Sequence, residues 1–226
     1  MAEIVDEPAF RNRAHVFDDR FQAGELLAAK LEEYKSAGNA HLLAIPAGGV
    51  QVASVIAERL GLPMDLAITR KIHVPWDREA GFGAVSWDGV VLLNEPLVAS
   101  LGLTKEEIDR CIAEEKEVIS RRMEKFRGAR PFPGLKEKIV IVVDDGLASG
   151  FSMLATAEAL RKSGVGEIIV AVPTAPVSAI KSVKPHVERI FCLNIRSGLL
   201  FAVANAYKVW FDLEDEDVVK ILKPAG

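Results

Sequence analysis

Hydrophobic positions along the chain alternate between helical spacing and short buried runs. Apolar residues three and four positions apart between residues 23 and 34 predict a first helix, with Gly38 as its C-terminal cap. Apolar runs at residues 41–45 and 64–68 predict two strands, and residues 50–60 between them have the spacing of a helix. This strand-helix-strand unit predicts parallel strands joined by a right-handed crossover.

The stretch from residue 70 to residue 130 follows a different pattern. Residues 71–81 are polar and contain proline and glycine, which predicts a loop. Two apolar runs flank Trp87-Asp88-Gly89, and Asp-Gly between such runs predicts a β-hairpin. Thr104 to Glu107 has the sequence of a capping box, so a long helix begins there and ends near Gly128.

The second half of the chain returns to alternating strands and helices. Residues 138–143 are β-branched almost throughout, which predicts a central strand buried on both faces. Further helices are expected at 153–162, 177–183, 203–211 and 214–222, and further strands at 167–172 and 189–193. The sum is a doubly wound α/β fold with a mainly parallel sheet of about five strands. We expect a single domain over residues 1–226, with residues 70–130 inserted as a flexible loop, a hairpin and a long helix.

Composition narrows the functional classes. The 226 residues are 50% hydrophobic and carry a net charge of −4, so we expect neither nucleic-acid nor anionic-membrane binding. The apolar runs are too short to span a bilayer. Two cysteines without metal-ligand spacing exclude a disulfide framework and favour a reducing cytoplasm.

Residues with chemical potential concentrate directly after the strand at 138–143. Asp144 and Asp145 end this strand, and a loop with two glycines and two serines follows before the next helix. In open α/β sheets, ligands bind at the carboxyl ends of strands, and a loop that opens a helix presents backbone N–H groups to an anion. Adjacent carboxylates suit hydroxyl groups or a divalent cation that the ligand carries. The pattern predicts a phosphorylated ribose with bound Mg²⁺; the alternative is that both acids solvate the strand end and Ser149 caps the helix.

The stretch from Val142 to Ser152 resembles the phosphoribosyl-diphosphate (PRPP) signature of type I phosphoribosyltransferases, in which apolar residues precede two acids and a Gly/Ser/Thr phosphate loop. The resemblance implies that Asp144 and Asp145 hold the ribose hydroxyls and reach Mg²⁺ only indirectly, through ribose or water. It also implies that the following loop binds the 5′-phosphate. The expected loop residues are Gly146, Leu147, Ala148, Ser149, Gly150, Phe151 and Ser152.

The order of elements agrees with this family over roughly residues 17–222. The chain most resembles a group of bacterial and archaeal proteins described only as predicted phosphoribosyltransferases. The shared segments are Phe17-Asp18-Asp19-Arg20, Arg70-Lys71, Gly83-Ala84-Val85 and Asp215-Glu216-Asp217.

Two further binding segments are implied by the same resemblance. Ala47, Gly48 and Gly49 follow the first predicted strand, where the family binds pyrophosphate; taken alone, this is an ordinary Gly-Gly turn. Arg70 and Lys71 end the second predicted strand, and adjacent cations there are often only a solvated edge. Because neighbouring strand residues point to opposite faces, only one can reach the pyrophosphate. We favour Lys71, with Arg70 second.

Residues 72–83 lie where the family has a flexible lid, whose closure excludes water. Glu79 and Arg78 could act there as acid/base and charge stabiliser, or could be ordinary exposed loop charges. Residues 201–211, with Tyr207 and Trp210, could cover a base pocket or pack against the sheet.

The resemblance implies phosphoribosyl transfer between Mg²⁺-PRPP and a nitrogenous base, of the nucleobase-salvage type, with an oxocarbenium-like transition state and pyrophosphate as leaving group. The expected catalytic residues are Asp144, Asp145, Lys71 and Glu79, in a homodimer. Ala148 stands where hypoxanthine/guanine enzymes of the family carry an acid, which argues against a 6-oxopurine. The alternative is a regulator that binds PRPP or a nucleotide without turnover.

Overall fold

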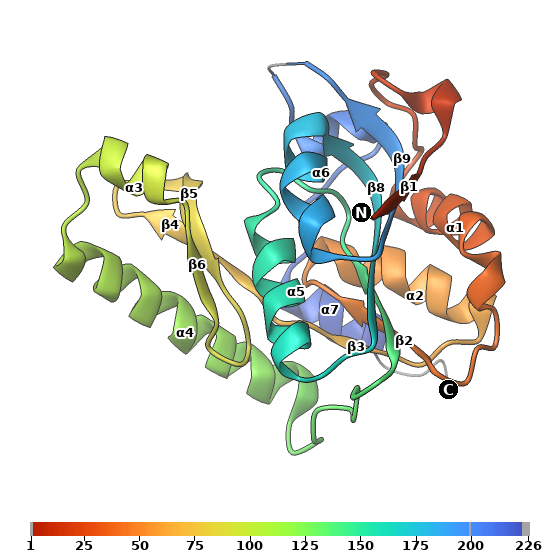
Figure 1. Ribbon diagram of the computed structural model, residues 1–226, viewed down its shortest axis with the longest axis horizontal. Coiled ribbons are helices and arrows are strands. Elements are labelled where there is room, and N and C mark those ends of the chain that lie inside the picture. The colour runs from red at the N-terminus through yellow and green to blue at the C-terminus, as the bar shows by residue number, and fades with distance from the viewer. Residues whose placement is uncertain (1, 199, 223–226) are drawn as a thin grey trace.

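The computed structural model describes residues 2–198 and 200–222, except for the side chains of Arg78 and Glu79. Its main sheet is parallel and confirms the doubly wound α/β class (Figure 1). In spatial order the strands are β1 (Glu3–Val5), β9 (Arg189–Arg196), β8 (Glu167–Pro176), β7 (Ile139–Val143), β2 (Ala40–Ala44) and β3 (Met64–Leu66). The sheet thus has six strands. Strand β1 has only three residues, and none of them is fully buried, which explains why its pattern was too weak to predict.

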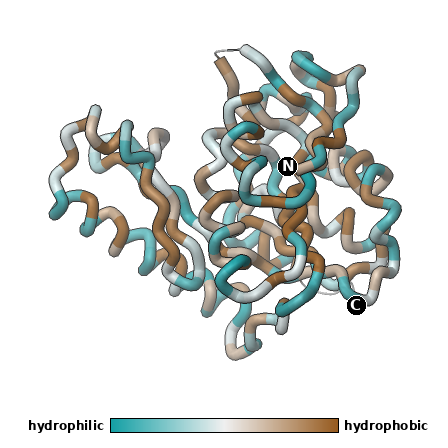
Figure 2. Tube along the Cα trace, viewed as in Figure 1, coloured by the Kyte–Doolittle hydropathy of each residue, from teal (hydrophilic) through white to brown (hydrophobic). Residues whose placement is uncertain are grey.

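Helices cover both faces of the main sheet. They are α1 (Arg20–Lys30), α2 (Gly48–Leu60), α5 (Phe151–Lys162) and α6 (Val177–Val183), while α7 (Asp215–Leu222) packs against α2. Alternate strand residues point to opposite faces, so Ile141 packs with α1 and α2 whereas Val140 packs with α5 and α6. Figure 2 shows hydrophobic residues concentrated in these central strands.

Residues 70–127 form a second, antiparallel sheet and two helices, which project to one side of the main sheet (Figure 1). The sheet contains β4 (Arg70–Val74), β5 (Asp77–Val85) and β6 (Val91–Leu93), and the helices are α3 (Glu95–Leu101) and α4 (Lys105–Arg127). The hairpin around Trp87-Asp88-Gly89 and the capping box of α4 are confirmed.

The predicted loop over residues 71–81 is wrong, because β4 and β5 pair there as a second hairpin. Ile72, Val74 and Phe82 are buried on this sheet, whereas Trp76 and Asp77 between them are exposed. Proline and glycine in the segment concealed this half-buried pattern from a composition-based assignment.

Two helix boundaries also differ from expectation. Helix α1 ends at Lys30, not at Gly38, because the Leu31 N–H bonds to both the Leu27 and Ala28 carbonyls and the chain tightens into a 3₁₀ turn. The helix predicted at 203–211 is only one 3₁₀ turn, followed by extended chain. The 3₁₀ turns lie at Pro8–Phe10, Glu32–Tyr34, Lys184–His186 and Val203–Ala206. Within residues 2–198 and 200–222, no helix combines the length and apolarity needed to cross a membrane.

Candidate active site

The acidic pair lies at the carboxyl edge of the main sheet, where open α/β sheets bind ligands. Strand β7 is buried from Val140 to Val143 and delivers Asp144 and Asp145 to this edge. Because Val143 pairs with Ala44 of the neighbouring parallel strand, the turn that follows β2 emerges beside the two acids. Two segments nearly 100 residues apart in the sequence thus meet at one edge.

Ala47 precedes α2, and the first two residues of that helix, Gly48 and Gly49, fit tightly against the acids; they are called the Gly48–Gly49 turn below. A Cβ on Gly48 would lie 1.8 Å from Asp145 Oδ2, and one on Gly49 would lie 2.7 Å from the Val143 carbonyl oxygen. Only glycine permits this approach. The Pro46–Ala47 peptide bond is cis. The sequence reasoning named these glycines for ligand contact, whereas the structure shows that they also make room for the acids.

The predicted phosphate loop lines a cavity of about 130 Å³. Its walls are Lys71, Asp144 and residues 146–153. Gly150 has a positive φ of 85° and turns the chain into α5, whose first residue is Phe151. The N-terminus of this 12-residue helix therefore opens on the cavity, where its N–H groups and positive dipole end favour an anion.

Arg20 holds Asp145 in a buried ion pair that the sequence did not predict. Its Nε donates to Asp145 Oδ2 at 2.8 Å, and its Nη1 donates to the Phe211 carbonyl at 2.8 Å. The guanidinium lies 3.8 Å from the centre of the Trp210 ring. The Tyr207 hydroxyl donates to the Asp145 carbonyl at 2.6 Å. The segment after Val203 thus packs against the acidic pair at the end of β7. Of the two alternatives for residues 201–211, this contact agrees in part with packing against the sheet.

The two acids differ in electrostatic environment. Burial and the neighbouring Asp145 charge raise the pKa of Asp144 well above its ordinary value. Burial also raises the pKa of Asp145, but its ion pair with Arg20 opposes that effect. Asp144 lines the cavity and its pKa is raised further by the Asp145 charge, so we expect it to benefit most from hydroxyl donors on a ligand.

The side chains of the two basic residues at the start of β4 line different cavities. Lys71 lines the cavity with the phosphate loop, and its contact with pyrophosphate stays a prediction. Arg70 instead bonds to Glu115 on α4 and lines a separate cavity. The structure therefore does not bring Arg70 to the site. The side chains of Glu79 and Arg78 lie outside the described residues, so the predicted role of Glu79 stays a prediction.

The described carboxylates at the site do not form a complete set of metal ligands. Among the residues that the structure describes, no group of three or more His, Cys, Asp or Glu side chains could hold an ion. With Asp145 bound to Arg20, the donor set fits a metal that arrives on the ligand and touches the acids through hydroxyls or water.

Comparison with known proteins gives the family of the chain. The family model for the phosphoribosyl transferase domain matches residues 88–206. A protein of Mycobacterium tuberculosis H37Rv, provisionally named a phosphoribosyl transferase, is 33% identical over 210 residues, which are 93% of this chain and 47% of that protein. The chain belongs to the phosphoribosyl transferase domain family. It is also similar to the crystal structure of TT1426 from Thermus thermophilus, with a TM-score of 0.71 and 33% identity over 91% of this chain and 97% of that chain.

The phosphoribosyl transferase domain match includes the acidic pair and the loop up to Ser152, but Arg20, the Gly48–Gly49 turn and Lys71 lie before its first residue. The chain spans about half the length of the curated relatives that it matches, 47% in each case.

Proposed function

We propose that this domain transfers a phosphoribosyl group between Mg²⁺-PRPP and a nitrogenous base. The observation that carries the proposal is the convergence of Asp144, the Gly48–Gly49 turn, Lys71 and the N-terminus of α5 on one edge of the main sheet. These groups supply a hydroxyl acceptor, two segments of backbone suited to anions, and a cation. PRPP combines the matching features in one molecule, and membership of the phosphoribosyl transferase domain family supports the choice.

Each part of the site has a distinct task in this proposal. The amides of residues 148–152, with Ser149 and Ser152, bind the 5′-phosphate, while Asp144 and Asp145 orient the ribose hydroxyls. The turn at Ala47 to Gly49 and the Lys71 ammonium bind the diphosphate. Catalysis comes from positioning the sugar and from stabilising charge on the departing diphosphate as the ribose approaches an oxocarbenium ion.

Mg²⁺ enters the proposal as part of the substrate. It would neutralise diphosphate charge and so favour departure of pyrophosphate. Asp144 and Asp145 would contact it through ribose or water, since the described residues offer no complete ligand set. The chain's own contribution is to hold the sugar with Asp144 and to keep Asp145 oriented through Arg20.

The acceptor is proposed to be a nucleobase of the salvage type. Ala148, exposed in the phosphate loop, supplies no carboxylate to a 6-oxopurine. The homodimer and the reducing cytoplasm expected from the sequence stay predictions.

The test incubates the protein with Mg²⁺-PRPP and one nucleobase at a time from a panel. Chromatography measures the pyrophosphate that is released. Release that requires one base, and that is lost in Asp144→Asn, is the expected result. PRPP binding without release on any base would overturn the transfer reaction in favour of a PRPP-binding regulator. If PRPP does not bind and Asp144→Asn/Asp145→Asn behaves like the wild type, both functions are wrong.

A further inference from the structure

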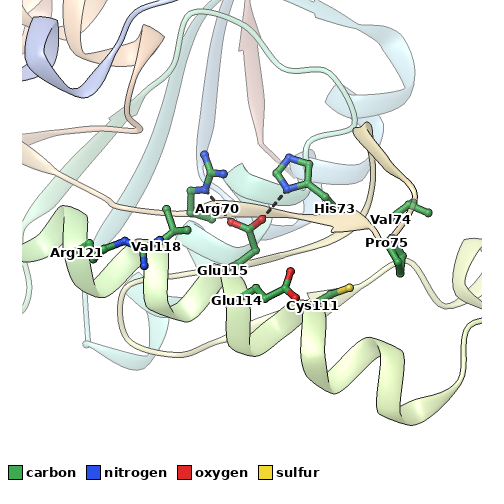
Figure 3. A pocket seen from close by; sticks show the side chains of 9 residues that line it. All are labelled: Arg70, His73, Val74, Pro75, Cys111, Glu114, Glu115, Val118 and Arg121. Carbon is green, nitrogen blue, oxygen red and sulfur yellow. Dashed lines mark hydrogen bonds and ion pairs between the residues drawn. The ribbon is translucent and has the colours of Figure 1, made fainter.

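Glu115 on α4 is a buried carboxylate outside the proposed site. The residue is 8% exposed, and its two oxygens accept bonds from Arg70 Nε at 2.9 Å and from His73 Nδ1 at 2.6 Å. Figure 3 shows the three side chains pointing toward one another between α4 and β4. Burial raises the pKa of Glu115, but its bonds to His73 and Arg70 outweigh burial and leave that pKa below its ordinary value. The carboxylate is therefore held in its charged form against two side chains of one strand.

The pairing of β4 with β5 is irregular where this double contact forms. Residues three apart on a regular strand point to opposite faces, so Arg70 and His73 would not meet the same partner. The pairing of β4 with β5 shifts register on both sides of His73. The extra residues lie in β5, and such bulges change the local twist of the paired strands. At this point of β4, His73 reaches the same carboxylate as Arg70.

Lys71 lies between the two residues that Glu115 holds. Its side-chain stem crosses the backbone of Gly81, where an added Cβ would lie 2.3 Å from Lys71 Cδ. It then lines the cavity of the phosphate loop, on the face of β4 that Arg70 does not use. The direction of the Lys71 side chain therefore depends on the position and twist of β4.

Strand β4 has a cavity beside it where it faces α4. It is at the edge of its sheet, paired only with β5 in the described sheet order. Beside α4 it borders a cavity of about 510 Å³ instead of filled core, with Arg70, His73 and Glu115 among the lining residues. Ile72 and Val74 of β4 are buried in the core, and the bonds to Glu115 add a polar link between strand and helix beside this cavity.

We propose that Glu115 is a positioning residue, which holds β4 through Arg70 and His73 and thereby directs Lys71 at the diphosphate of PRPP. The inference rests on the proposed function and extends it to a residue that touches no substrate. It assigns Arg70 a task different from the pyrophosphate contact that its position in the sequence suggested.

The test compares the dissociation constants of Mg²⁺-PRPP and of ribose 5-phosphate by calorimetry. Ribose 5-phosphate lacks the diphosphate, so it reports on the rest of the site. We expect Glu115→Gln to weaken PRPP binding about tenfold and to leave ribose 5-phosphate binding unchanged, because small misplacements of a binding group have effects of this order. Glu114→Gln, at an exposed neighbour in the same cavity, is the matched control and should bind PRPP like the wild type.

A cycle with Lys71→Ala separates positioning from general stability. If Glu115 acts through Lys71, Glu115→Gln should add no further loss of PRPP affinity in the Lys71→Ala background. An equal loss in both backgrounds, an equal loss for both ligands, or no loss at all would overturn the inference. His73→Phe, which has no side-chain donor and keeps the carboxylate paired with Arg70, gives the same comparison if Glu115→Gln does not fold. Absence of PRPP binding by the wild type would instead refute the proposed function, together with this inference.

Discussion

Replacing Arg20 by methionine tests whether the buried ion pair holds the acidic side of the site together. Arg20 and Asp145 have only 4% and 14% of their side chains exposed, and their closest atoms are 2.8 Å apart. Methionine has a similar length and can still pack against the Trp210 ring, but it carries no charge and no donor. The substitution thus leaves the Asp145 carboxylate in place without its counter-charge.

Loss of the ion pair with Asp145 should account for most of the decrease in the free energy of unfolding. Water can replace Arg20 at the Phe211 carbonyl, since Phe211 is 51% exposed. The contact with Trp210 contributes about 0.5–2 kcal/mol, part of which methionine recovers by packing. Breaking a buried pair by removing one partner costs about 3–5 kcal/mol. Because Asp145 retains some solvent contact, we expect Arg20→Met to lower the free energy of unfolding by about 3 kcal/mol.

Urea unfolding of Arg20→Met, Asp145→Asn and the double variant measures this cost. We expect the double variant to be more stable than Arg20→Met alone, with a coupling energy above about 1 kcal/mol. Without Arg20, the pKa of Asp145 should rise further. A carboxyl with a raised folded-state pKa is stabilising when protonated, and that stability is lost as the pH rises through the folded pKa. The loss of unfolding free energy in Arg20→Met should therefore be smaller in acid. A loss below about 1 kcal/mol at neutral pH, together with single-variant effects that simply add in the double variant, would refute the reasoning.

Two further predictions concern the same edge of the sheet. Gly49→Ala should lower the free energy of unfolding by about 1–3 kcal/mol in thermal or urea unfolding, because its Cβ would meet the Val143 carbonyl at 2.7 Å. Gly38→Ala, where an added Cβ meets nothing within 4 Å, is the control and should leave stability unchanged or slightly raised. Asp144→Asn should raise the free energy of unfolding by about 1 kcal/mol at neutral pH, because it removes the charge of a carboxyl whose pKa is raised by burial and by Asp145. The same substitution should weaken PRPP binding. This gain in stability should vanish as the pH falls and the wild-type Asp144 carboxyl is protonated. An Asp144→Asn variant with unchanged or lower stability at neutral pH would contradict a raised pKa of Asp144.

The main sheet could be predicted from the sequence because its signals are local. The β-branched run of β7 and the capping box of α4 each lie within a few residues and are read directly from the chain. Strand β1 and the hairpin of β4 and β5 could not be predicted. Strands β1 and β4 lie at sheet edges, where only part of the strand is buried, and β5 contains Gly81 and Gly83, so the hydrophobic pattern is weak in each.

The candidate site shows the same division. The phosphate loop is one continuous segment, so its composition reveals it. Arg20 is 125 residues from Asp145 in the sequence, and no local pattern connects them. Arg70 was the second candidate for the pyrophosphate contact, but strand alternation places it on the face of β4 where it bonds to Glu115. Contacts that depend on packing between distant elements are those that the sequence does not reveal.

A crystal structure of the chain with Mg²⁺-PRPP tests the proposed site most directly. We predict the 5′-phosphate within hydrogen-bond distance of the backbone N–H groups that open α5, and the diphosphate between the Gly48–Gly49 turn and Lys71. Binding of PRPP elsewhere, such as in the cavity beside Arg70 and Glu115, would contradict the proposed site.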